Sequence, residues 1–398
     1  MKNLIRKMTT LIIIVSAAAQ LDAQSVKIDS IYEFKTKVDL KTTSVKDQYK
    51  SGTCWSFSGI SFIESELLRM GKGEYDLSEM YIVNRDYHNR AIDYVIWNGS
   101  KKFGSGSEGG NVFNRIREYG IMPQSAYSGL NYGSDKHMNN EMDAVLKNYV
   151  EAIIQNPNGK LSTAWINGFD AVLDSYLGTI PESFVYEGAK YTPTEFRDAL
   201  GINPDDYIEL TSFSHHPLYS KFIMEVEDNW ELCEVYNVSI DELTNLAFGA
   251  LDKGYTLLWG GDVSELGFSW RNGIAIVPAD EDEDMAGTDR ERLNQSSKSI
   301  DKHPNLFKQI VPEIEITPEN RQAAFDNYET TDDHGMHITG YLTDKNGIRY
   351  FKVKNSWNDS NIFNGYIYMS ETFFRYKTLT LIVHKDAVPN SLKKKLKL

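Results

Sequence analysis

Between Asp47 and Ser58 the chain reads DQYKSGTCWSFS. A turn containing Gly52 leads into a segment whose apolar residues, up to Leu68, cover most of the circumference of a helix. A helix that is apolar on nearly all sides is buried at the centre of a domain. Cys54 stands in its first turn, where the positive end of the helix dipole lowers the pKa of a thiol and favours the thiolate. The sequence therefore predicts a central helix with a reactive cysteine at its start.

The alternative for a lone cysteine is an inert place in the core, which is the more common environment. We assign that environment to Cys233, because no glycine turn precedes it. Since these are the only two cysteines of the chain, a scaffold stapled by several disulfides is excluded.

The segment from Asp332 to Trp357 predicts a β-hairpin with a two-residue turn at Asn346–Gly347. In that register, alternation places His334 and Asn355 on the same, mostly apolar face. His337 falls on the opposite face, so its replacement is expected to be mild. Taken singly, a histidine on an apolar face is more often an ordinary core residue. A buried imidazole beside a buried amide is held in one tautomer, however, and with a thiolate nearby it becomes the base of a Cys-His-Asn apparatus.

The composition narrows the function classes. Of the 398 residues, 41% are hydrophobic and 25% are charged, which is typical of a globular protein. The net charge of -14 makes the chain a poor electrostatic match for nucleic acid. No apolar run approaches the length of a membrane span, so a polytopic membrane protein is excluded.

The N-terminus has the pattern of a secretory signal peptide. Basic residues at 2, 6 and 7 precede a short apolar run at 11–15 and small residues at 16–19. We expect cleavage after Ala19 or, preferably, Ala23. The mature chain 24–398 would then be exported to the periplasm or the extracellular space and would have no membrane association. The alternative interpretations of this segment are a buried strand or a membrane anchor.

Several motifs resemble the papain-like cysteine peptidases. Residues 48–58 are similar to the active-site signature of that family, and residues 334–341 resemble its catalytic-histidine strand, whose spacing to Gly340 selects His334. Residues 355–357, Asn-Ser-Trp, match a third motif. The resemblance implies that Cys54 is the nucleophile, that His334 is the base, and that Asn355 orients His334. Trp357 would shield this pair from water, and Gln48 would form the oxyanion hole together with the backbone N–H of Cys54. Gly109 and Gly110 would let the substrate backbone approach closely.

The branch that the chain resembles is that of bleomycin hydrolase and the bacterial aminopeptidases C. This implies an α+β papain-like fold, with a helical half around the central helix and an antiparallel β-barrel half. Insertions at about 134–238 and 279–325 would form a mostly helical addition within one peptidase domain, 24–398. The expected partners are peptide substrates, a homo-oligomer is compatible with the branch, and neither a cofactor nor a metal is expected.

Two alternatives remain open at this point. One is a papain-like endopeptidase with an open cleft, and the other is a non-catalytic peptide-binding relative. The branch uses a long C-terminal arm whose carboxylate captures the free amine of the substrate. Here the tail from Val388 to Leu398 is short and carries four lysines, so we expect that it does not gate the site.

Overall fold

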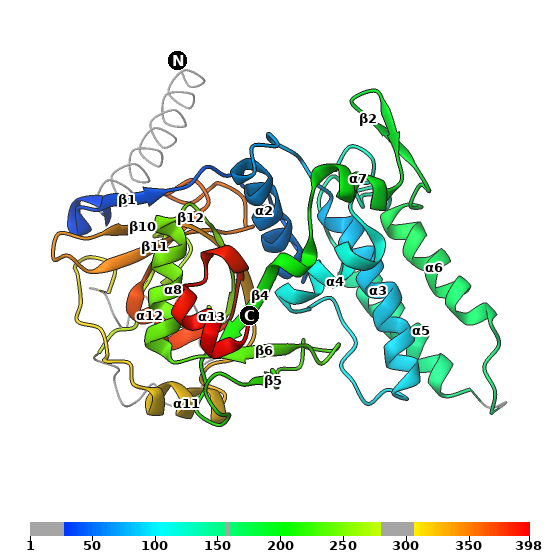
Figure 1. Ribbon diagram of the computed structural model, residues 1–398. Coiled ribbons are helices and arrows are strands. Elements are labelled where there is room, and N and C mark those ends of the chain that lie inside the picture. The colour runs from blue at the N-terminus through cyan, green and yellow to red at the C-terminus, as the bar shows by residue number, and fades with distance from the viewer. Residues whose placement is uncertain (1–27, 157–158, 280–305) are drawn as a thin grey trace, which may run out of the picture.

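The computed structural model describes residues 28–156, 159–279 and 306–398. The predicted signal peptide, residues 1–23, and the part of the second predicted insertion from 280 to 305 lie outside these residues. The fold has a helical half and a sheet half, with the central helix between them (Figure 1). No helix within the described ranges is both long and apolar enough to cross a membrane.

The helical half is organised around the predicted central helix, α2. Every residue of α2 from Trp55 to Leu67 is buried, because the helix packs against the sheet on one side and against other helices on the other. Ser78 caps the following helix by accepting a hydrogen bond from the backbone N–H of Tyr81, as its sequence position predicts. The helices of this half are α2 (Cys54–Arg69), α3 (Glu79–Ile96), α4 (Gly109–Tyr119), α5 (Asn140–Ile154), α6 (Ala164–Leu177) and α7 (Pro193–Leu200).

The sheet half contains one large mixed sheet, mostly antiparallel, with the order β5-β6-β4-β13-β7-β10-β11-β12-β9-β8; β1 pairs with β10 beside this path. The strand path does not close among the described residues, so the expected barrel is an open sheet. It branches at β10, whose ten residues pair with β7 at one end and with β1 at the other. Its strands are β1 (Lys35–Asp39), β4 (Tyr207–Thr211), β5 (Lys221–Ile223), β6 (Glu234–Asn237), β7 (Leu257–Gly261), β8 (Phe268–Ser269), β9 (Ile274–Ala275), β10 (His334–Thr343), β11 (Arg349–Lys354), β12 (Tyr366–Ser370) and β13 (Thr378–His384).

Helices cover the outer face of the sheet. Helix α8 (Ile240–Asp252) begins with a capping box formed by Ser239 and Glu242. Helices α11 (Pro318–Asp326), α12 (Glu371–Lys377) and α13 (Asn390–Leu396) follow later in the chain. The C-terminal tail forms α13, which buries Leu392 and Leu396 in the core that α8 also lines. Lys395 pairs with Glu242 of α8 at 2.6 Å, so the tail is held on this outer layer.

The insertion at 134–238 is only partly the helical addition that was expected. Helices α5, α6 and α7 and the hairpin β2 (Phe184–Tyr186) and β3 (Ala189–Tyr191) extend the helical half. The part from Tyr207 onward instead joins the main sheet, where β4 pairs with β13. Its alternating apolar residues Ile208 and Leu210 are buried in the sheet core, which a helical assignment overlooked.

The hairpin of β10 and β11 differs from the prediction in its turn. The loop spans residues 344–348, because the side chain of Asp344 accepts the backbone N–H groups of Asn346 and Ile348. This shifts the register by one residue next to the turn, and a β-bulge between Ile338 and Gly340 shifts it by one more. After both shifts, the residues at the end of the hairpin away from the turn lie on the faces that were predicted. His334 and Asn355 are at this end.

Candidate active site

The N-terminus of α2 meets the start of β10 at the junction of the two halves. Cys54 is the first residue of α2 and His334 the first residue of β10, and both line one cleft. Gly335 makes this approach possible. A Cβ atom at Gly335 would lie 2.9 Å from Ser58 Oγ and 3.4 Å from Trp55 Cα. The glycine directly after the histidine was the sequence signal for this contact, and our sequence reasoning missed it.

The tautomer of His334 follows from its hydrogen bonds. Asn355 Oδ1 accepts the backbone N–H of Ser356 at 2.8 Å, which identifies this atom as the amide oxygen. The same oxygen lies 2.8 Å from His334 Nε2, so Nε2 must donate and carry the proton. Nδ1 of the neutral imidazole is therefore free to accept a proton. The ring of Trp357 covers this pair, with its centroid 4.6 Å from that of His334.

Burial dominates the proton affinities of the two reactive groups. It raises the pKa of the Cys54 thiol to about 12, although a hydrogen bond from the Gly335 backbone opposes the shift. It lowers the pKa of His334 to about 4. The expectation that the helix terminus lowers the pKa of Cys54 is therefore wrong while His334 is neutral. The loss of solvation of the thiolate outweighs its stabilisation by the helix dipole. A thiolate becomes favourable here only when its proton passes to His334, which gives an ion pair at the helix terminus.

Gln48 is buried beside the cysteine turn but is already engaged. Its Nε2 donates to the carbonyl oxygen of Ser51 at 2.9 Å, and its Oε1 accepts from Ser356 Oγ at 2.5 Å. An amide nitrogen has two N–H groups, so one remains for an oxyanion. Gln48 is not among the residues that line the cleft, and its role there stays a prediction.

The two glycines at the start of α4 serve packing as well as the cleft. Gly109 lines the cleft, where a Cβ atom would lie 3.0 Å from Leu258 Cδ2. Gly110 is not part of the lining, and a Cβ atom there would lie 2.6 Å from Glu209 Oε2. The close approach that both glycines permit is to the protein's own sheet. Gly109 also lines the cleft, and contact of either glycine with a substrate stays a prediction.

His337 is a packing residue, and the mild effect on activity predicted for its replacement stays a prediction. It points to the opposite face from His334, as predicted, but that face packs against α2 and is fully buried. Its Nδ1 lies 2.9 Å from Ser61 Oγ. Its replacement is therefore not mild for stability. Cys233 is a free, half-buried thiol within 3.7 Å of Asn111 Oδ1, in agreement with a structural assignment.

Sequence reasoning also missed the acidic wall of the cleft. Glu108, Asp228 and Asp332 line it together with Cys54 and His334. Asp228 comes from the loop 224–233, which connects β5 to β6 and reaches the helical half (Figure 1). There Trp230 Nε1 donates to Ser107 Oγ at 3.0 Å. Nothing in the local sequence links these three distant acids, because only the fold brings them together.

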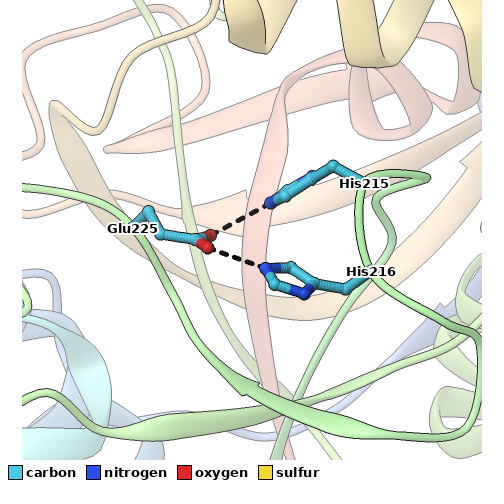
Figure 2. Close-up of side chains that lie close together, drawn as sticks. All are labelled: His215, His216 and Glu225. Carbon is cyan, nitrogen blue, oxygen red and sulfur yellow. Dashed lines mark hydrogen bonds and ion pairs between the residues drawn. The ribbon is translucent and has the colours of Figure 1, made fainter.

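A cluster with metal-ligand chemistry lies elsewhere in the insertion. His215, His216 and Glu225 bring one ligand atom each to within 4.8 Å of one another (Figure 2). Both histidines direct Nε2 at the carboxylate of Glu225, at 3.0 Å and 2.7 Å. This cluster is not part of the cleft lining.

The sequence of the chain is similar to those of known cysteine peptidases. Residues 32–167 match the model of the papain family cysteine proteases, and residues 287–398 match that of the peptidase C1-like family. The chain is 24% identical to aminopeptidase G and 23% identical to aminopeptidase C of Lactobacillus delbrueckii subsp. lactis, covering 87% and 95% of this chain and 82% and 86% of those proteins. The chain is thus similar to the papain-like cysteine peptidases, and among them to the aminopeptidases C.

A solved structure supports the fold of this peptidase. The crystal structure of PepW from Lactobacillus rhamnosus HN001 superposes with a TM-score of 0.67 at 20% identity, over 91% of this chain and 84% of that one. The α+β papain-like fold expected from the sequence is therefore confirmed. The expected class, a cysteine-type peptidase, is supported by the family model and by the aminopeptidase relatives.

Proposed function

We propose that this peptidase hydrolyses peptide bonds with Cys54 as nucleophile, His334 as general base and acid, and Asn355 as the residue that positions His334. The observation that carries the proposal is the hydrogen bond between Asn355 Oδ1 and His334 Nε2, since it leaves Nδ1 unprotonated in the cleft that Cys54 also lines. We further propose that the enzyme acts outside the cytoplasm after removal of residues 1–23.

The reaction follows from these assignments. His334 Nδ1 takes the thiol proton, and the thiolate attacks the carbonyl carbon to form a tetrahedral intermediate. Its oxyanion is stabilised by the backbone N–H of Cys54, which has no partner within the helix at this position, and by the free N–H of Gln48. His334 then protonates the leaving amine as the C–N bond breaks. Water, deprotonated by His334, finally hydrolyses the thioester and releases the carboxylic acid.

Substitution of the nucleophile tests the proposal. Cys54→Ser is expected to lower kcat at least a thousandfold while leaving the circular dichroism and melting temperature unchanged, because an alcohol is a far weaker nucleophile than a thiolate. Labelling with an epoxysuccinyl inhibitor should modify Cys54 and leave Cys233 free. Activity within tenfold of the wild type, or an adduct on Cys233 alone, would contradict the assignment and favour the peptide-binding alternative.

A further inference from the structure

The acidic wall of the cleft has an incomplete charge balance. Asp228 is neutralised, since its Oδ1 lies 3.1 Å from Lys102 Nζ and 4.0 Å from Arg90 Nη2. Glu108 differs, because the residue is 5% exposed and no described basic group pairs with it. Its Oε2 accepts a long hydrogen bond, 3.4 Å, from Thr380 Oγ1, and its carboxyl group also shares a hydrogen bond with the carboxyl group of Asp332. Its Oε1 is buried and accepts no hydrogen bond from any described donor.

The neighbours of Glu108 add to this imbalance. The charges that repel its carboxylate are those of Glu209 and Asp228, whereas the hydrogen bond from the Asp332 carboxyl group stabilises it. Lys102, the basic group that acts on Asp332, is already paired with Asp228. Burial and repulsion from Glu209 raise the pKa of Glu108 to about 8. A buried carboxylate without a counter-charge is unfavourable, so this wall is complementary to a cation that the described chain does not supply.

The same cleft offers an apolar surface beside the acids. Leu258 and Ile382 line it from β7 and β13, next to Gly109. A group with a short aliphatic stem and a positive head would pack its stem on these side chains and place its head at Glu108. Cys54 lies in the same lining, so the positive group would belong to the peptide being cleaved.

We propose that Glu108 and Asp332 form a subsite for an ammonium group of the peptide substrate, held beside the bond that Cys54 attacks. The proposal rests on the function proposed above. The ammonium has two sources, the free N-terminus of a short peptide and the side chain of a lysine. Both have the same chemistry at Glu108, and the experiment separates them.

The test uses four coumarylamide substrates on the full mature chain. These are acetyl-Ala-Ala, Ala-Ala with a free amine, acetyl-Lys-Ala and acetyl-Gln-Ala. We expect kcat/KM of at least one cationic substrate to exceed that of both neutral ones by tenfold or more. A preference for free Ala-Ala alone assigns the N-terminus, and a preference for acetyl-Lys-Ala alone assigns the side chain.

Substitutions locate the preference. Glu108→Gln and Asp332→Asn should each reduce the ratio of cationic to neutral kcat/KM at least fivefold. Glu182→Gln, which makes the same change at an exposed position, should leave the ratio as in the wild type. Equal cleavage of neutral and cationic substrates by the wild type, with Cys54 labelled normally, would overturn the subsite alone. No cleavage of any substrate and no labelling would overturn the proposed function as well.

A separate observation concerns His215, His216 and Glu225 (Figure 2). Gln322 Oε1 accepts the backbone N–H of Ser214 at 2.7 Å, so this atom is the amide oxygen. It lies 3.1 Å from His215 Nδ1, which must therefore donate. In a neutral His215, Nε2 then carries no proton, and its lone pair faces Glu225 Oε2, which lies 3.0 Å away. Two acceptors at this distance require a positive charge between them.

We infer that the charge is a divalent metal ion of the zinc type, bound by His215 Nε2, His216 Nε2 and Glu225. Two imidazoles and a carboxylate are ligands that zinc prefers, and Gln322 supplies the second hydrogen bond that orients a metal-bound histidine. Glu225 belongs to the loop 224–233, so the ion would anchor the loop that carries Asp228 to the cleft.

Calorimetric titration of the chelator-treated protein with zinc chloride at pH 7.5 tests this site. We expect one equivalent to bind and the melting temperature to rise. His216→Ala and Glu225→Gln should abolish both effects. His88→Ala, which removes a histidine paired with Asp170 at 2.8 Å, should retain them. Absence of binding in the wild type, or binding unaffected by His216→Ala and Glu225→Gln, would show that the positive charge is only a proton on His215.

Discussion

His334 and Cys54 are two groups that burial keeps neutral in one cleft. Because the pKa of His334 is lowered to about 4, the imidazole remains able to accept the thiol proton in mildly acidic solution. We expect kcat/KM for the neutral substrate acetyl-Ala-Ala to fall on the acid side with a midpoint near pH 4. A pH profile in a constant-ionic-strength buffer measures this, and a midpoint near the ordinary histidine value of about 6.5 would contradict the burial argument.

The same shift affects stability with a defined sign. A histidine whose pKa is lower in the folded state binds fewer protons there than in the unfolded chain. His334 and His337 both have lowered pKa values. The contribution of these two neutral histidines to the free energy of unfolding is therefore complete above about pH 6.5. It is lost as the pH falls toward their pKa in the folded state. Buried carboxyl groups with raised pKa values, such as Glu108, act in the opposite direction over this range, so the test compares the wild type with His337→Ala by urea unfolding at pH 7 and pH 5. The change in the free energy of unfolding from pH 7 to pH 5 should be less unfavourable in the variant, which lacks the His337 contribution.

His337 has a packing role. It is fully buried between β10 and α2, and its ring lies edge-on to Phe62 with centroids 5.9 Å apart. His337→Ala leaves a cavity and removes one of the two hydrogen-bond partners of Ser61 Oγ, the other being Lys354, so we expect a loss of about 2–4 kcal/mol in the free energy of unfolding. At a temperature where the variant is folded, kcat should stay within about threefold of the wild type. An unchanged free energy of unfolding would refute this packing role.

At the scale of elements, the contact between α2 and β10 sets the catalytic geometry. Gly335→Ala would push the start of β10 away from Trp55 and Ser58 and so displace His334 from Cys54. A misplacement of about 1 Å is enough to cost on the order of a hundredfold in rate, and we expect kcat to fall by at least tenfold.

The matched control for this substitution is Gly249→Ala in α8. A Cβ atom at Gly249 meets no atom within 4 Å, and alanine favours the helix. This variant should keep full activity and equal or higher stability. If Gly335→Ala retained wild-type kcat, the closeness of the two elements would not be what limits the geometry.

At the scale of the whole molecule, the C-terminal tail belongs to the scaffold. Leu392 and Leu396 of α13 are buried against the outer layer, and no tail residue lines the cleft. We expect a short polar extension after Leu398 to leave the ratio of free-amine to N-blocked cleavage unchanged. Deleting residues 391–398 should instead lower the melting temperature, because two buried leucines contribute about 1.5–3 kcal/mol each.

The measurement is the ratio of kcat/KM for free Ala-Ala to that for acetyl-Ala-Ala. It is compared between the extended chain and the wild type. If the extension raised N-blocked cleavage strongly, the chain end would reach the cleft after all. The acidic wall would then share its task with the terminal carboxylate.

The central helix, its cysteine and the pairing of His334 with Asn355 could be predicted from the sequence, because each depends on local signals. Apolar residues around α2 require burial wherever the helix packs, and the three motifs occur in the order of the papain-like family. The face predicted for His334 was correct only because there are two shifts of one residue, one at the longer turn and one at the β-bulge, and the second restores the alternation that the first reversed.

Only the tertiary structure decided the rest. Burial of the thiol and the imidazole reverses the expected pKa of Cys54, because the loss of solvation depends on residues far away in sequence. The fold places α2 against the far face of β10, which turns His337 into a core residue. It also gathers Glu108, Asp228 and Asp332 from three separate loops beside Cys54. Local patterns fix which residues can react or pack, whereas long-range contacts fix their solvation and their neighbours.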